Sequence, residues 1–108
     1  MEPEQARIKV EYGINTTFVT FLDKRILDDR QIRQLHESLE PVIKKNEDGE
    51  MAMNFANVGF MSSAMLGLLV RVHKRVSERG GRVRLANLDP SLRKVFEITR
   101  LTQIFEIS

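Results

Sequence analysis

The chain has 108 residues, 17 Lys and Arg against 15 Asp and Glu, and no cysteine. This length suits one hydrophobic core without room for a second, so we expect a single domain over residues 1–108. The lack of cysteine excludes disulfides and thiolate metal sites, and neither the polar N-terminus nor any apolar run resembles a signal peptide or a membrane span, which predicts a cytoplasmic protein without membrane insertion.

Two strands are predicted near the N-terminus. Apolar and polar residues alternate over residues 8–12, and Gly13-Ile14-Asn15 is typical of a turn. A second apolar run follows over residues 16–22, so the two strands are expected to form a hairpin.

The first predicted helix begins after Asp28, which is a favourable N-cap residue with Gln31 as its capping-box partner. Pro41 lies inside this helix and removes one main-chain hydrogen bond, so we expect a kink or an early end there. The predicted buried stripe consists of Ile32, Leu35, Leu39 and Val42 or Ile43.

A β-α-β unit is predicted in the second half of the chain. Residues 51–55 form a short apolar run, and residues 82–86 predict another strand after a helix stop at Gly80-Gly81. One face of the intervening helix is marked by Ala64, Met65, Leu68, Leu69, Val72 and Val76. We expect the two strands to be parallel and their connection to be right-handed.

A short helix and a last strand are predicted near the C-terminus. Asp89 and Pro90 are typical of an N-cap and a first helical residue, and Phe105 with Ile107 predicts the strand. The side chains expected to face inward from the helix are Leu92, Val95 and Phe96. These elements together predict an α/β fold, with a mixed sheet of four to five strands packed with about four helices.

Ser62 and Ser63 stand immediately before the apolar helix, where a hydroxyl can cap the helix, act as a nucleophile or accept a phosphate. A nucleophile at such a turn needs small residues two positions away on each side, but Met61 and Met65 flank Ser63 there. A base is lacking as well, because His73 lies in the same predicted helix. We therefore expect no enzymatic activity and no catalytic residue, and local physics favours simple capping.

Other patterns predict no metal, no cofactor and no nucleic acid. His36 and Glu40 have i,i+4 spacing without a third ligand, which favours a solvated pair, and no phosphate-loop motif surrounds Gly80-Gly81.

Residues 1–54 carry 8 Lys and Arg against 11 Asp and Glu, whereas residues 55–108 carry 9 against 4. The basic half could steer an acidic partner, although solvated helix faces are the favoured interpretation. No aromatic interleaving or motif for nucleic-acid binding accompanies these charges.

Residues 60–67, Phe-Met-Ser-Ser-Ala-Met-Leu-Gly, resemble the signature of the STAS domain in bacterial anti-sigma factor antagonists. That signature runs aromatic, Met or Val, Asp or Ser, Ser, a small residue, Gly, Leu and Gly. The resemblance continues, in the same order as in the family, through residues 19–28, 80–90 and 95–105. It implies a STAS fold over nearly the whole chain.

The resemblance assigns the phosphate acceptor to Ser63, with Ser62 as a second candidate acceptor. The chain departs from the signature at Ser62, where Asp is common, and at Met65, where Gly is common. The residues implied for partner binding are Met61, Ser62, Ser63, Met65 and Leu66. We add Asp23 and Asp28, on the loop after the second strand, because they could lie near the start of the serine helix, although ordinary surface turn residues are the default interpretation.

The function implied by the resemblance is that of an anti-sigma factor antagonist. The unphosphorylated protein would bind a serine kinase that is also an anti-sigma factor, so that a sigma factor is released, and a PP2C-type phosphatase would reset the protein. Two alternatives stay open. One is a constitutive subunit of a lipid-transport or sensory assembly, and the other is a small-molecule or nucleotide sensor.

Overall fold

Five strands form one mixed sheet in the computed structural model, which describes residues 7–108. They are β1 (Ile8–Tyr12), β2 (Thr16–Phe21), β4 (Glu50–Asn54), β6 (Arg82–Ala86) and β7 (Glu106–Ile107). Their order across the sheet is β1-β2-β4-β6-β7, with β1 antiparallel to β2 and the other neighbouring pairs parallel. The predicted α/β fold with a mixed sheet is confirmed.

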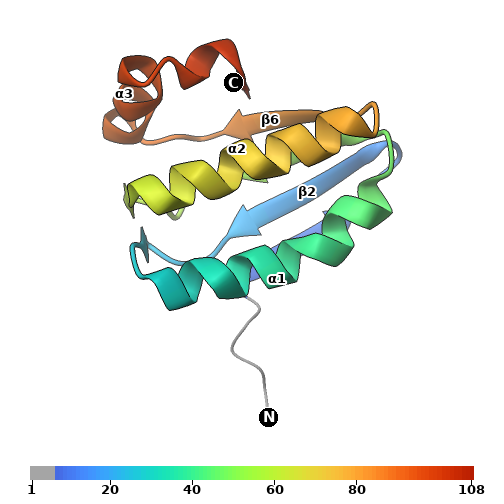
Figure 1. The fold of residues 1–108 in the computed structure, drawn as a ribbon, viewed down its shortest axis with the longest axis horizontal. Helices are drawn as coiled ribbons and strands as arrows, with labels where there is room; N and C mark the ends of the chain where they lie inside the picture. The colour runs from blue at the N-terminus through green and yellow to red at the C-terminus, as the bar shows by residue number, and fades with distance from the viewer. Residues whose placement is uncertain (1–6) are drawn as a thin grey trace.

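Two helices, α1 (Asp29–Asn46) and α2 (Ser63–Glu78), lie side by side over one face of the sheet (Figure 1). The alternation along β2 shows which face they cover, because Thr17, Val19 and Phe21 are buried whereas Phe18 is exposed. The chain then forms α3 (Pro90–Ile98) and a 3₁₀ turn, η1 (Leu101–Gln103). The predicted number of about four helices thus corresponds, within residues 7–108, to three α-helices and one 3₁₀ turn.

The predicted capping box at the start of α1 is confirmed. The carboxylate of Asp28 accepts hydrogen bonds from the main-chain N–H of Arg30 and Gln31, and the Gln31 side chain accepts one from the N–H of Asp28. The early end considered at Pro41 does not occur, since α1 continues to Asn46. Pro41 and Glu37, whose carbonyl loses its donor, both lie on the exposed side, where water can replace the missing bond.

The structure corrects one inward-facing prediction in α3. Asp89 and Pro90 are the N-cap and first residue, as expected, and Leu92 and Phe96 are buried. Val95, however, is 39% exposed. This helix has only nine residues, and its buried part is the narrow stripe of Leu92 and Phe96, where Phe96 meets the ring of Phe105 edge-on at 5.9 Å.

The predicted β-α-β unit is confirmed as β4, α2 and the parallel strand β6. An additional feature lies between β4 and α2, where β5 (Phe60–Met61) pairs in parallel with β3 (Arg25–Ile26), outside the main sheet. Within residues 7–108, no helix combines the length and the apolar composition needed to cross a bilayer.

Gly81 lies between α2 and β6, where main-chain atoms pack too closely to admit a side chain. A Cβ there would lie 2.5 Å from the carbonyl oxygen of Gly49 and 2.9 Å from Cγ1 of Val76. Gly81→Ala should therefore lower the free energy of unfolding by about 1–3 kcal/mol, measured by urea denaturation. Gly59→Ala is the matched control, because its Cβ would lie 3.8 Å from the nearest atom. Equal stability of the two variants would contradict this account.

Candidate functional site

The two serines lie where β5 meets the N-terminus of α2. The main-chain N–H of Ser62 donates to the carbonyl oxygen of Ile26 at 3.0 Å, and the N–H of Gly59 donates to that of Lys24 at 2.8 Å. The ladder between β3 and β5 therefore holds the backbone that enters α2 against the segment that enters α1. As a consequence, the N-termini of the two helices open at the same end of the molecule.

The two hydroxyls have different roles. Ser62 is the N-cap, and its Oγ accepts a hydrogen bond from the N–H of Met65 at 3.3 Å. Ser63 is the first residue of α2, its side chain is exposed, and its hydroxyl has no hydrogen-bond partner among the described residues. Capping is thus assigned to Ser62, and the Ser63 hydroxyl stays accessible to another protein.

The expectation from the sequence that Met65 contributes to partner binding is wrong. Its side chain is completely buried, on the stripe of α2 that also contains Leu68 and Leu69. A side chain on this stripe cannot contact another protein without opening the core. Met61 and Leu66 are partly buried and pack against the same core, so both keep some accessible surface.

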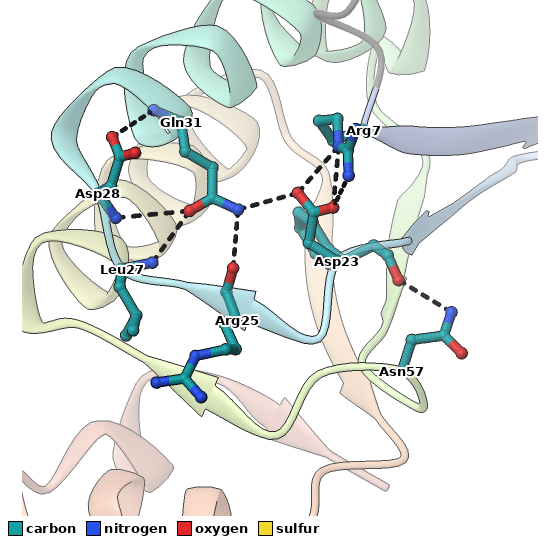
Figure 2. Close-up of polar contacts among 8 residues, drawn as sticks. Arg7, Asp23, Arg25, Leu27, Asp28, Gln31 and Asn57 are labelled. Carbon is teal, nitrogen blue, oxygen red and sulfur yellow. Dashed lines mark hydrogen bonds and ion pairs between the residues drawn. The ribbon is translucent and has the colours of Figure 1, made fainter.

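Figure 2 shows that the Gln31 side chain connects α1 with the segment before it. Its Nε2 donates to the carbonyl oxygen of Arg25 at 2.8 Å and to Asp23 Oδ2 at 2.9 Å. Its Oε1 accepts from the N–H of Leu27 at 3.0 Å. One amide therefore binds the backbone at both ends of β3, while the opposite edge of β3 binds β5.

Asp23 is the second member of this network. Its carboxylate pairs with the guanidinium of Arg7, whose Nε donates to Oδ1 at 2.8 Å (Figure 2). The hydrogen bond from Arg7 holds the pKa of Asp23 below its ordinary value, against the opposing effect of burial. The sequence suggested the capping role of Gln31 but not its contacts with Asp23 and Arg25. These contacts join α1 to the loop before it, and no sequence motif indicates them.

The predicted roles of Asp23 and Asp28 in partner binding stay predictions. Both belong to the segment that the β3–β5 ladder connects to the start of α2. Both carboxylates also have structural partners, Arg7 and Gln31 for Asp23 and the first main-chain N–H groups of α1 for Asp28. On the other side, Asn57 Nδ2 donates to the carbonyl oxygen of Phe21 at 3.1 Å and so fixes the loop before β5 (Figure 2).

Both histidines have contacts that do not involve Ser62 or Ser63. His36 Nε2 is 3.3 Å from Glu40 Oε2, and Glu40 also pairs with Arg75, which connects α1 to α2. His73 packs edge-on against Phe105, with ring centres 5.3 Å apart. Within the described part of the chain, no group of three His, Asp or Glu residues is arranged to hold a metal.

The division between the two serines predicts different stabilities for their alanine variants. Ser62→Ala removes the bond to the Met65 N–H and should lower the free energy of unfolding by about 0.5–2 kcal/mol. Ser63→Ala should lower it by less than about 0.5 kcal/mol, because no hydrogen bond within the described residues is lost. Urea denaturation of both variants measures the difference. A larger loss for Ser63→Ala than for Ser62→Ala would overturn the assignment of the cap.

The ion pair of Asp23 predicts a pH dependence of stability. A folded-state pKa below the ordinary value of 3.8 means that the carboxylate stabilises the fold above that pH. The contribution should be lost as the pH falls from 3.8 through the lower folded-state pKa. We expect the difference in unfolding free energy between the wild type and Asp23→Asn to be constant near neutral pH and to shrink in acid. An unchanged difference down to the acid limit would count against the pair.

A family model for the STAS domain matches residues 12–108. The anti-sigma-B factor antagonist of Bacillus subtilis (strain 168) is 35% identical over 74 residues, which is 68% of this chain and 66% of that protein, just under two thirds of its length. A solved anti-sigma-factor antagonist (STAS) domain protein from Planctomyces limnophilus is similar with a TM-score of 0.82 and 20% identity, covering 94% of this chain and 87% of the other. The Bacillus cell fate determinant SpoIIAA in its phosphorylated form is similar with a TM-score of 0.70 and 22% identity, covering 94% and 90%. This chain belongs to the STAS domain family.

Proposed function

We propose that this protein is an anti-sigma factor antagonist controlled by phosphorylation of Ser63. The unphosphorylated protein binds a serine kinase that is also an anti-sigma factor, and the sigma factor is released. A PP2C-type phosphatase then removes the phosphate. The observation that carries the proposal is the exposed Ser63 hydroxyl, which stands at the first position of α2 and is not used as its cap. The relative named an anti-sigma-B factor antagonist supports the partner class.

The position of Ser63 suits a group that gains negative charge. Main-chain N–H groups at a helix N-terminus lack intrahelical partners, and the helix dipole is positive there. The first turn of α2 contains no acidic side chain, so a phosphate on Ser63 meets no like charge within that turn. Phosphorylation should therefore leave the fold intact.

The same phosphate would oppose binding at an interface that covers Ser63. It adds about −1.5 to −2 charges at neutral pH, and burying such a group without matching cations costs several kcal/mol. A loss of only about 3–4 kcal/mol weakens an affinity by two to three powers of ten. The complex would be lost while the domain stays folded.

In this proposal the protein is a substrate and a binding partner, and the kinase supplies the catalysis. Neither histidine is placed to activate the Ser63 hydroxyl, since His36 pairs with Glu40 and His73 packs on Phe105. Residues of the kinase must then remove the hydroxyl proton and orient the phosphate donor. No activity of its own is assigned to this chain.

The first experiment is site-mapped mass spectrometry of the protein purified from its native cells with phosphatase inhibitors. We expect a phosphate on Ser63, because Ser62 Oγ is engaged in capping. Phosphate confined to Ser62 would overturn the assignment of the acceptor. No phosphate under any growth or stress condition would overturn the regulatory proposal in favour of a constitutive assembly subunit.

Charge at Ser63 provides a second test. Ser63→Asp should weaken binding of the purified kinase by about two to three powers of ten, whereas Ser63→Ala should bind like the wild type. Melting temperatures of both variants should stay near that of the wild type. Ser77→Asp is the control, because Ser77 is exposed in the last turn of the same helix. Equal binding by Ser63→Asp and Ser77→Asp would contradict the proposal.

A further inference from the structure

The strand β1 forms a free edge of the main sheet. It pairs with β2 on one side, and within residues 7–108 no strand pairs with its other side. Its five residues follow β2 in continuous register without a bulge, and none of them is proline. The strand at the opposite edge of the sheet, β7, has only two residues. A long and regular edge strand is a template for another strand, because its outer main-chain groups are unpaired.

The main-chain groups that β1 presents at this edge follow from its ladder with β2. At one end of the ladder, the N–H of Gly13 donates to the carbonyl oxygen of Thr16 at 2.7 Å. At the other end, the N–H of Leu22 donates to the carbonyl oxygen of Arg7 at 3.1 Å. Hydrogen-bonded pairs alternate along an antiparallel ladder, so every second residue between these ends bonds β2. The residues left with N–H and C=O groups that point outward are Ile8, Val10 and Tyr12.

The side chains of β1 divide between the two faces of the sheet. Ile8, Val10 and Tyr12 alternate onto the face covered by α1 and α2, where the first two pack against the core. Lys9 and Glu11 lie on the uncovered face, with side chains that are 67% and 68% exposed. Each β1 strand thus carries an apolar row on one face and one charge of each sign on the other.

This pattern is complementary to itself when a second copy of β1 is placed antiparallel to the first. With Val10 opposite Val10 of the second copy, Lys9 of each copy lies opposite Glu11 of the other. These positions are non-hydrogen-bonded pairs of the new ladder, in which Cα atoms are only about 4.5 Å apart and side chains are closest. A register centred on Lys9 or on Glu11 would instead place like charges opposite each other, which is unfavourable. The charges therefore favour the register centred on Val10.

Helix α1 extends the same contact. It packs on both β1 and β2, so its axis lies about 5 Å from the outer edge of β1. The ammonium of Lys45 lies 4.4 Å from the centre of the Tyr12 ring, which identifies the side of α1 that faces this edge. Helical spacing places three uncharged residues on that side, namely Gln34, Ser38 and Pro41. Two copies of α1 would lie about 10 Å apart, which is close to the distance between packed helices.

We propose that a second copy of this chain binds at the free edge of β1, so that the two sheets join into one across a two-fold axis at Val10. The outward main-chain groups of Val10 pair with those of Val10 of the second copy, and those of Ile8 pair with Tyr12 of the second copy. Ion pairs between Lys9 and Glu11 cross the uncovered face. The contact is isologous, so it closes as a dimer and leaves no free β1 edge. No residue of α2 takes part, and the inference therefore does not depend on the proposed function.

Exchange of charge tests the register. The full chain is studied by sedimentation velocity from about 1 μM to about 1 mM, and we expect a reversible equilibrium between monomer and dimer. Lys9→Glu or Glu11→Lys alone should weaken the dimer about tenfold or more, because like charges then lie opposite each other. An equimolar mixture of the two variants should regain the wild-type affinity, and so should the double variant. Lys74→Glu, exposed on α2, makes the same change of charge and should leave the equilibrium unchanged.

Val10→Pro tests the main-chain contact independently of charge. The N–H of Val10 points away from β2, so proline removes a bond to the second copy and none within the ladder to β2. We expect the dimer to weaken about tenfold or more. Melting temperatures show whether each variant is folded, and the charge variants decide alone if Val10→Pro is not.

Two results would overturn the inference. One is a wild-type chain that stays monomeric over the whole concentration range. The other is a dimer whose affinity is unchanged in Lys9→Glu and in folded Val10→Pro, since another surface would then join the two copies. Neither result bears on the phosphorylation of Ser63.

Discussion

The candidate site depends on the two-residue ladder between β3 and β5. These strands lie outside the main sheet, so hydrogen bonds to β2 or β4 do not position them. Their place is set by the Gln31 amide on one edge and by each other on the other edge. Because the N–H of Ser62 belongs to the same set of bonds, the start of α2 is positioned by a side chain of α1. Hydrogen bonds between sequence-distant segments thus determine where the serine hydroxyls stand.

In the proposed function, the serine pair separates a structural task from a regulatory one. If the acceptor were the capping residue itself, modification would consume the hydroxyl oxygen that bonds to the N–H of Met65 and would have to rebuild the cap around the phosphate. With Ser62 bonded to the N–H of Met65, Ser63 can change its charge while the cap persists. Its position at the end of the helix dipole adds a favourable interaction for the charged form. In this proposal, the adjacent serines allow modification while the cap of α2 is kept.

Much of the fold could be predicted because its signals are local. Alternation gave β1, the capping box gave the start of α1, and Asp89-Pro90 gave the start of α3. The β3–β5 ladder had no such signal, since two-residue strands are too short to show a period and their pairing joins distant segments. At the site, the serines were identified by position and resemblance, but Met65 was wrongly placed at the surface. The helical spacing in the sequence already places Met65 on the buried stripe of α2, and this spacing is the better guide to the position of its side chain.

The opposite ends of α1 and α2 are held by different contacts. The buried Asn46 amide accepts from the Thr17 hydroxyl at 2.9 Å and donates to the carbonyl oxygen of Gly49 at 2.9 Å, and an Arg79 Nη2 donates to the carbonyl oxygen of Lys44. These contacts involve none of the residues around Ser63. Substitutions at the serine end can accordingly change the surface there while the far end keeps the helices in place. The fold thus allows the surface at the serine end to change in evolution without requiring a new core.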